Sequence, residues 1–229
     1  MGITAIIPAR GGSTRVPRKN VKSFNGQAMV SWPIQAALAS AFIDRVVVST
    51  DDDEIAQVAI ASGAEVPFTR SEELSSAHAG TAPVIVHAID ELGIADSDVV
   101  MCLYPTAPVP VFVLDEAIKV AMEHPEHFTI SVGRHRSPLE RALGALGDGF
   151  MAIESTRSLL ARTQDLPQRF FDAGKFYLAT AGLWRTKETM MSDPFVPYYL
   201  SDWASVDMDE PDDWPIAEAL HRAFVLEAS

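Results

Sequence analysis

The segment best suited to bind an anion runs from residue 8 to residue 20 and reads Pro-Ala-Arg-Gly-Gly-Ser-Thr-Arg-Val-Pro-Arg-Lys-Asn. Adjacent glycines, Gly11 and Gly12, allow a sharp turn in which successive N–H groups face a ligand. Arg10 offers a planar guanidinium to phosphate oxygens, and Lys19 offers a mobile ammonium. The residue order matches neither a P-loop nor a G-x-G-x-x-G dinucleotide site, which weighs against kinases, ATPases and dehydrogenases.

Charge is distributed unevenly along the chain. The 229 residues carry a net charge of −13, yet no acidic residue precedes Asp44, and five of the 18 basic residues lie between positions 10 and 22. So acidic a protein is not expected to bind nucleic acid. A compact basic segment within it predicts one local anion site, although charge alone is equally compatible with a solvated basic loop.

A second candidate site is the aspartate pair in Ser205-Val206-Asp207-Met208-Asp209. If Ser205–Met208 is a strand, as we expect, alternation places Asp207 and Asp209 on one face. Two adjacent carboxylates repel unless a cation or a proton lies between them, and Mg²⁺ prefers a few carboxylates together with waters and phosphate oxygens. The pair therefore predicts a magnesium site. The alternative is that Asp209 caps the next helix and Asp207 is exposed.

Strand-like and helix-like patterns alternate along much of the chain. The expected strands are Ile3–Pro8, Arg45–Thr50, Glu65–Thr69, Asp98–Leu103, Phe128–Val132, Lys175–Ala179 and Ser205–Met208. The expected helices are Ala28–Ser40, a helix capped by Thr50 or Asp51 and ending near Ser62, Thr81–Leu92, Val111–Glu123 and Asp212–Ala223. This order predicts an α/β fold, with a Rossmann-like, mostly parallel sheet flanked by helices, in a single domain over residues 1–229.

Residues 133–171 break this alternation, with charged, glycine and proline positions mixed among apolar ones. We expect an inserted arm or lid there, and a dimer contact. In open parallel sheets, ligands bind beyond the carboxyl ends of the strands. The basic loop, Tyr104–Pro108 and Asp207–Asp209 all fall at such ends, which predicts one shared site.

Other features narrow the class of protein. No apolar stretch approaches the ~20 residues that a membrane span needs, and no charged leader precedes an apolar segment. We therefore expect neither membrane insertion nor a secretory signal, and a cytoplasmic location. The single cysteine, Cys102, excludes an intrachain disulfide and a multi-cysteine zinc site, and we expect it to be buried.

The loop and several later segments resemble the cytidylyltransferases that activate sialic acids and related nonulosonic acids. Residues 7–13 are similar to the signature of that family, and the Ser13-Thr14-Arg15 version resembles the enzymes that activate the eight-carbon acid Kdo. Further likeness to the branch acting on pseudaminic acid lies in Val48–Asp52, Val66–Arg70, Tyr104–Pro108, Arg162–Leu166 and Asp172–Tyr177. Two positions depart from that branch, where Lys175 stands for a glutamine and Phe171 for a histidine.

The resemblance implies a nucleotide-diphospho-sugar transferase fold, a Mg²⁺ cofactor and a homodimer. The implied reaction transfers CMP from CTP to the C2 hydroxyl of an acidic nine-carbon sugar and releases pyrophosphate. Pseudaminic acid is favoured, with legionaminic and N-acetylneuraminic acids as alternatives. No side chain stands out as the general base.

The resemblance also assigns residues to these partners. It implies that the triphosphate is bound by Arg10, Ser13, Lys19 and Asn20, with Gly11 and Gly12 in the same loop, and that cytosine is bound by Arg70, the backbone near Ala79 and Thr81. The implied sugar-binding residues are Tyr104, Gln164, Asp172, Lys175 and Tyr177. The implied metal ligands are Asp207 and Asp209. Arg10, Lys19 and the two aspartates are the residues expected to act in catalysis.

Two other functions remain open on the sequence. Asp207-Met208-Asp209 also fits the D-x-D metal motif of a glycosyltransferase that uses a preformed nucleotide sugar, although the basic loop suits a free triphosphate better. A non-catalytic nucleotide-binding protein is the third alternative; it would bind CTP and show no turnover.

Overall fold

The computed structural model describes residues 1–13, 15–76, 79–154, 160–192 and 194–227. Its centre is a six-stranded sheet with the strand order β10-β6-β9-β5-β1-β4. These strands are β1 (Ile3–Pro8), β4 (Arg45–Ser49), β5 (Val99–Leu103), β6 (Thr129–Arg134), β9 (Phe170–Thr180) and β10 (Val196–Tyr199). Strands β4, β1 and β5 are parallel, β10 is parallel to β6, and β9 runs antiparallel to β5 and β6. The predicted α/β class with a mostly parallel sheet is confirmed.

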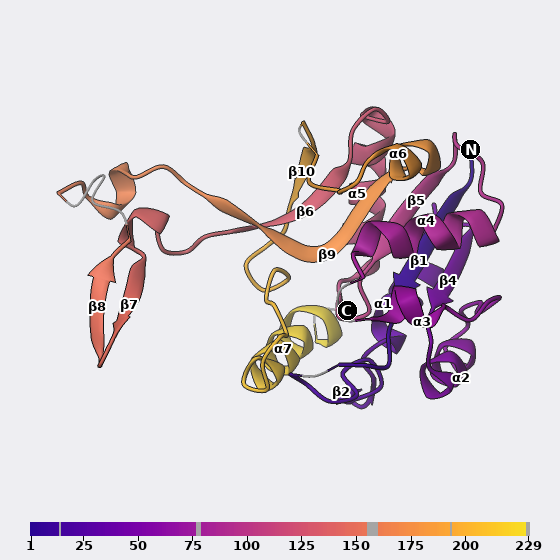
Figure 1. Cartoon of the computed structure of the whole chain (residues 1–229), viewed down its shortest axis with the longest axis horizontal. Helices are drawn as coiled ribbons and strands as arrows, with labels where there is room; N and C mark the ends of the chain where they lie inside the picture. The colour runs from indigo at the N-terminus through magenta and orange to yellow at the C-terminus, as the bar shows by residue number, and fades with distance from the viewer. Residues whose placement is uncertain (14, 77–78, 155–159, 193, 228–229) are drawn as a thin grey trace.

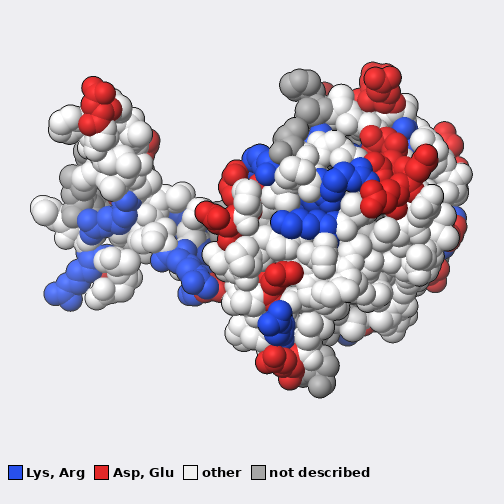
Figure 2. Space-filling view, turned by 90° about the horizontal axis from the view of Figure 1, so that it is seen from below, with Lys and Arg blue, Asp and Glu red and all other residues white. Residues whose placement is uncertain are grey.

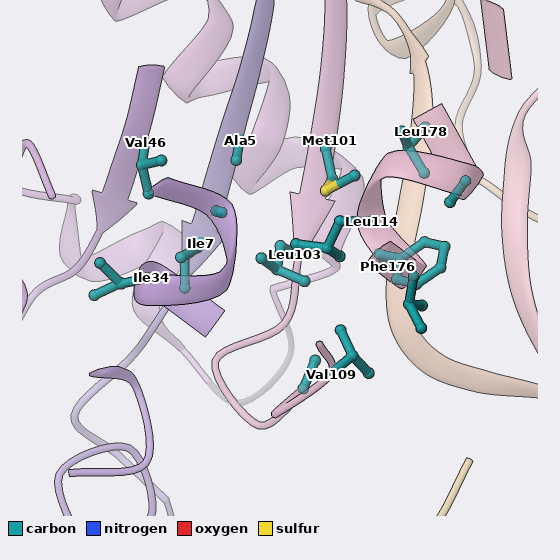
Figure 3. Packing of buried hydrophobic residues seen from close by; sticks show 14 of the residues in the cluster. Ala5, Ile7, Ile34, Val46, Met101, Leu103, Val109, Leu114, Phe176 and Leu178 are labelled. Carbon is teal, nitrogen blue, oxygen red and sulfur yellow. The ribbon is translucent and has the colours of Figure 1, made fainter. Parts of the chain in front are cut away.

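Helices cover both faces of the sheet (Figure 1). The helices are α1 (Ser31–Leu38), α2 (Asp53–Ala61), α3 (Glu72–Ser75), α4 (Thr81–Glu91), α5 (Val111–Glu123), α6 (Ala181–Thr186) and α7 (Asp213–His221), which continues as one π-turn over Arg222–Leu226. On one face, α1, α2 and α5 pack on the sheet, as with Ile34 and Leu114 near Ile7, Met101 and Phe176 in Figure 3. On the other face, α4 and α6 bury their apolar side chains.

A third, smaller apolar cluster joins the two ends of the chain. The short hairpin of β2 (Ser23–Phe24) and β3 (Gln27–Ala28) packs against α7. Phe24 and Trp214 lie edge to face with ring centroids 5.5 Å apart, and the indole of Trp214 donates to the carbonyl of Ser23. Figure 1 shows α7 beside β2, below the sheet. The segment that precedes α7 is thereby brought beside the segment that follows β1.

Several elements differ from their predicted bounds. Helix α5 matches its prediction, α4 ends one residue early, and α2 is capped by the side chain of Asp52, which accepts the N–H of Ile55. The predicted strand Glu65–Thr69 is reduced to single bridges at its two ends. The predicted strand Ser205–Met208 is wrong: Val206–Asp209 is irregular, and β10 takes the sheet edge instead.

The strand predicted at Lys175–Ala179 is the second half of the longer β9. Between β6 and β9 the chain leaves the sheet and forms an arm that projects from the body (Figure 1). The arm carries a turn at Leu139–Arg141, the hairpin of β7 (Leu143–Gly147) and β8 (Phe150–Ile153), and a turn at Thr163–Asp165. In the described part of the chain, no helix combines the length and the apolar character needed to cross a membrane.

Candidate functional site

A cleft of about 320 Å³ lies where β1 and β5 reach their carboxyl ends. The loop after β1, the segment after β5, Arg70 and the N-terminal end of α4 form its walls. The predicted site residues that line it are Arg10, Ser13, Lys19, Asn20, Arg70, Ala79, Thr81, Tyr104 and Asp209. Residues 190 and more positions apart thus share one cavity, as expected if the predicted phosphate loop and one of the predicted metal-binding aspartates act together.

The cleft is strongly basic. Among the described residues that line it, four are basic (Arg10, Arg15, Lys19 and Arg70) and one, Asp209, is acidic. Figure 2 views the molecule from the carboxyl ends of the parallel strands and shows Lys and Arg side chains gathered on the body beside an acidic patch. An excess of positive charge in a concave site favours a polyanion such as a triphosphate.

Hydrogen bonds to neighbouring segments fix the loop after β1. Buried Asn20 donates its side-chain amide to the carbonyl of Arg10, at 2.9 Å, and the guanidinium of Arg10 donates to the carbonyl of Ser76, at 3.0 Å. The N–H of Gly11 donates to Asp51 at 3.0 Å, and neither Gly11 nor Gly12 lines the cleft. The expectation that these glycine N–H groups face phosphate therefore stays a prediction, and Thr14 lies outside the described residues.

Close packing against Asp52 explains why residue 11 is a glycine. A Cβ atom at Gly11 would lie 2.6 Å from Oδ2 of Asp52, whereas one at Gly12 would have no neighbour within 4 Å. Asp52 caps α2 and pairs with Arg18. The hydrogen bond from Arg18 is the main reason why the pKa of Asp52 is about 2. Arg18 therefore stabilises the start of α2 through Asp52, and it does not line the cleft.

Asp209 is tied to the loop through two cations. Its carboxylate oxygens lie 3.2 Å from Nζ of Lys19 and 2.7 Å from the guanidinium of Arg15. Partial burial raises the pKa of Asp209, but the hydrogen bonds and charges of these two cations outweigh it, so the pKa lies below its usual range. Asp209 is thus an ionised carboxylate on a cationic wall. The sequence places Arg15 in the basic segment and in the family-like Ser13-Thr14-Arg15 stretch, without a predicted role in the site. Its place in that stretch is the signal that could have assigned it.

The partner aspartate is placed differently. Asp207 is exposed, accepts the N–H of Met208 at 2.8 Å, and does not line the cleft, while Met208 between the two aspartates is buried. The side chain of Asp213 accepts the N–H of Asp209 at 3.0 Å. The alternation of polar and apolar residues in Ser205–Asp209 therefore reflects the burial of Met208 and does not indicate a strand. The segment is irregular, and Asp213 accepts one of its N–H groups.

The residues of the cleft fit a Mg²⁺ site in which the nucleotide and waters supply most of the ligands. Among the described residues, no group of three or more His, Cys, Asp and Glu side chains could hold a metal ion. Mg²⁺ bound to nucleotides takes one or two carboxylates and completes its octahedron with phosphate oxygens and waters. An ionised Asp209 on the wall of the basic cleft suits that donor set as a single carboxylate, and Asp207 lies outside the cleft.

Three of the predicted sugar-binding residues lie together beside the cleft. The hydroxyls of Thr81 and Tyr104 are 2.6 Å apart, and the rings of Tyr104 and Tyr177 meet edge to face at 5.8 Å. The hydroxyl of Tyr177 donates to Asp172 at 2.6 Å. Burial raises the pKa of both tyrosines well above the usual value, so both remain neutral donors.

The two other predicted sugar-binding residues lie elsewhere. Gln164 belongs to the turn at Thr163–Asp165 on the arm, which Figure 1 shows away from the body. Lys175 is 2% exposed and its ammonium donates to the carbonyl of Val206 at 2.6 Å. Burial lowers the pKa of Lys175 to about 8, although the charge of Asp207 favours the ammonium.

Comparisons with known proteins agree with this geometry. A sequence profile described as cytidylyltransferase matches residues 4–138. The chain is 33% identical over 220 residues to the pseudaminic acid cytidylyltransferase of Campylobacter jejuni, with 95% of each chain covered. It is 32% identical to the CMP-N,N'-diacetyllegionaminic acid synthase of Legionella pneumophila, with 96% of each covered.

The fold is that of solved nucleotidyltransferases. The structure of CMP:2-keto-3-deoxy-manno-octonic acid synthetase complexed with CTP superposes with a TM-score of 0.72 at 16% identity, covering 98% of this chain and 100% of that one. This likeness confirms the expected nucleotide-diphospho-sugar transferase fold. Because the profile spans more than half of the chain and two relatives exceed 30% identity over nearly all of it, the chain belongs to the cytidylyltransferase family.

Proposed function

We propose that the protein transfers CMP from CTP to the C2 hydroxyl of a nonulosonic acid, with pseudaminic acid as the favoured substrate. In this reaction the sugar oxygen forms a bond to the α-phosphorus, the bond between that phosphorus and the bridging oxygen breaks, and pyrophosphate leaves. The hydroxyl proton is released. The observation that carries the proposal is the single cleft that unites the cations of the β1 loop with Asp209.

The nucleotide is assigned to the basic wall of the cleft. Arg10 and Lys19, with Ser13 and Asn20, hold the triphosphate and offset the charge that builds up on the departing pyrophosphate. Arg70 is assigned to cytosine together with the backbone near Ala79 and the hydroxyl of Thr81. Its side chain is 3% exposed and donates to Ser75 at 3.2 Å, so the guanidinium is held in one orientation before a base arrives. Such preorganisation lowers the cost of binding.

The sugar is assigned to the side of the cleft that carries Tyr104, Tyr177 and Asp172. Their hydroxyl and carboxylate groups are oriented by one another and by Thr81. Placing the C2 hydroxyl against the α-phosphorus is the main catalytic requirement of such a transfer, because catalysis of phosphoryl-type transfer depends on positioning and charge stabilisation.

Magnesium is part of the proposal. Asp209 on the cleft wall would hold it, and Asp207, which lies outside the cleft in the ligand-free chain, is the second proposed ligand. Arg15 and Lys19, which contact Asp209, are proposed to turn toward phosphate oxygens when the nucleotide enters. When bound, the ion supplies charge neutralisation at the phosphates.

A homodimer is also proposed, with the arm as the contact. Four large apolar side chains on the β7–β8 hairpin are 60–70% exposed: Leu143, Leu146, Phe150 and Met151. Such a hairpin is expected to be covered by a partner. A partner's arm also offers a way for a residue such as Gln164 to reach a sugar site.

Competing substrates and reactions can be separated in one experiment. Purified protein is incubated with CTP, Mg²⁺ and each of pseudaminic, legionaminic and N-acetylneuraminic acids, and pyrophosphate release gives kcat/KM. The highest value is expected with pseudaminic acid. A higher value with another acid would reassign the substrate, and no release with any of them, despite CTP binding, would support a non-catalytic protein. Turnover with a preformed CMP-sugar and an acceptor glycan, without CTP, would indicate a glycosyltransferase.

A further inference from the structure

Lys175 is a buried lysine that forms no direct ion pair with an acidic side chain in the described part of the chain. Only 2% of the residue is exposed, and none of the ion pairs among the described residues includes its ammonium. The ammonium donates a hydrogen bond to the carbonyl of Val206, at 2.6 Å. Burying a charge costs several kcal/mol unless the group is well hydrogen-bonded, so such a contact is retained at a stability cost. A structural or functional reason for it is therefore expected.

The backbone of Lys175 is held firmly in the sheet. Strand β9 bulges here: Ile130 pairs with Tyr177, whereas Val132 pairs with Asp172, which leaves four residues opposite Ser131. The hydroxyl of buried Ser131 accepts the N–H groups of Lys175 and Phe176, each at 3.1 Å. The carbonyl of Lys175 accepts the N–H of Tyr104 at 2.9 Å. The side chain therefore extends from a fixed point in the sheet.

The other end of the contact lies in the aspartate segment. Val206 directly precedes Asp207 and is three residues from Asp209, in a stretch without regular secondary structure. The charge of Lys175 is within electrostatic reach of both aspartates. On its far side, the segment is fixed by Asp213, which accepts the N–H groups of Asp209 and Glu210. The Lys175 bond thus joins this irregular segment directly to the central sheet, in addition to the ion pairs of Asp209 with Lys19 and Arg15.

The space around Lys175 does not suit a sugar. The small cavity that it lines has a volume of about 20 Å³, enough for about one water molecule. Its other walls include Trp203, Met208 and His221. Lys175 is absent from the walls of the large cleft, in which the nucleotide is placed.

We propose that Lys175 is a positioning residue, which ties Val206 to the sheet so that Asp209 is held in the cleft, and that it does not contact the sugar. The tether itself is a property of the ligand-free chain. Its consequence for catalysis rests on the proposed function, in which Asp209 serves the metal and the nucleotide.

Amide hydrogen exchange of the ligand-free full-length protein tests the tether without any activity. The Lys175→Met variant keeps the length of the side chain and removes the donor, and Lys119→Met, at an exposed position of α5, is the matched control. We expect peptides covering Ala204–Glu210 to exchange at least about tenfold faster in Lys175→Met, with unchanged rates in the control. Lys175→Gln provides a second variant, which retains a donor, and should fall between the two.

Steady-state kinetics test the consequence. In Lys175→Met we expect kcat to fall about tenfold or more and the Mg²⁺ concentration for half-maximal rate to rise, while KM for the sugar changes less than about twofold. Unchanged exchange of Ala204–Glu210, or a raised sugar KM with unchanged magnesium dependence, would overturn the proposal. If the wild-type protein shows no cytidylyltransferase activity, the exchange experiment still decides on the tether, and only the proposed function fails.

Discussion

Asp209 meets two cations from the opposite end of the chain, and this contact is the residue-scale basis of the proposed site. Lys19 and Arg15 hold the pKa of Asp209 below its usual range, so its carboxylate is ionised at neutral pH. An ionised carboxylate between cations has two uses, which are to hold the cations in place and to exchange them for Mg²⁺ when a triphosphate arrives. Both uses require charge at Asp209.

The Asp209→Asn variant separates charge from shape. We expect a folded protein, since the side chain is 37% exposed, with turnover reduced roughly 100-fold, because metal-linked stabilisation is worth several kcal/mol at about 1.4 kcal/mol per tenfold. Pyrophosphate release in saturating Mg²⁺ is the measurement. Glu210→Gln is the matched control: Glu210 also pairs with Arg15, but it is outside the cleft, and its removal should change turnover by less than about twofold. Near-normal release by Asp209→Asn would remove the metal role.

The sequence predicts the chemistry of individual residues better than their partners. Arg10, Lys19 and Asp209 were assigned to one site and line one cleft. The pairing of Gly11 with Asp51 and of Lys175 with Val206 could not be predicted, because both depend on loops whose positions are set by contacts far along the chain.

At the scale of elements, the glycine loop and the start of α2 form one unit. A Cβ on Gly11 would displace Asp52, which caps α2, whereas Gly12 has open space beside it. We therefore expect Gly11→Ala to lower the free energy of unfolding by about 1–2 kcal/mol, the usual cost of losing a cap, with Gly12→Ala close to wild type. Urea denaturation is the measurement. Equal stability of the two variants would show that the loop moves away from Asp52 at little cost.

Helix α7 ends on a buried histidine that should make stability depend on pH. Burial lowers the pKa of His221 from 6.5 to about 4, and its Nδ1 lies 3.2 Å from the side-chain nitrogen of Asn25. The unfolded chain therefore takes up this proton first, and the stabilisation is complete above pH 6.5 and is lost as the pH falls toward 4. At about 1.4 kcal/mol per pH unit, the loss between pH 7.5 and pH 5 is about 2 kcal/mol.

Urea unfolding at the two pH values, for the wild type and for His221→Gln, measures this term. We expect the pH-dependent loss to shrink in His221→Gln and to persist in His124→Gln, a control at an exposed position. The same loss in wild type and His221→Gln would assign the pH dependence to other groups.

The helices α4 and α5 follow the sequence prediction most closely, because their apolar periodicity is clear even though neither has a side-chain cap. Strand predictions failed where a partner was needed. Ser205–Met208 has the alternation of a strand, but no strand among the described residues pairs with it. Val196–Tyr199, in contrast, contains a proline and still pairs with β6 at the sheet edge. Alternation reports which side chains are buried, and pairing depends on the whole fold.

At the scale of the molecule, the arm exposes large apolar side chains that do not pack against the body. Leu146 and Phe150 are each 70% exposed on the hairpin, so replacing them costs the monomer little. We expect the wild type to sediment as a dimer and a Leu146→Glu/Phe150→Glu variant to sediment as a monomer at the same concentration, with unchanged thermal stability of the body. Sedimentation velocity measures this. A monomeric wild type, or a variant that stays dimeric, would rule out this contact.

In the proposed function, one cleft built from both ends of the chain joins CMP to an acidic sugar. Mass spectrometry of a reaction containing only the protein, CTP, pseudaminic acid and Mg²⁺ tests it most directly. We expect a CMP–pseudaminic acid product, formed in equal amount to pyrophosphate and about 100-fold more slowly by Asp209→Asn. Consumption of CTP without a CMP-sugar, or the same initial rate of product formation by Asp209→Asn, would contradict it.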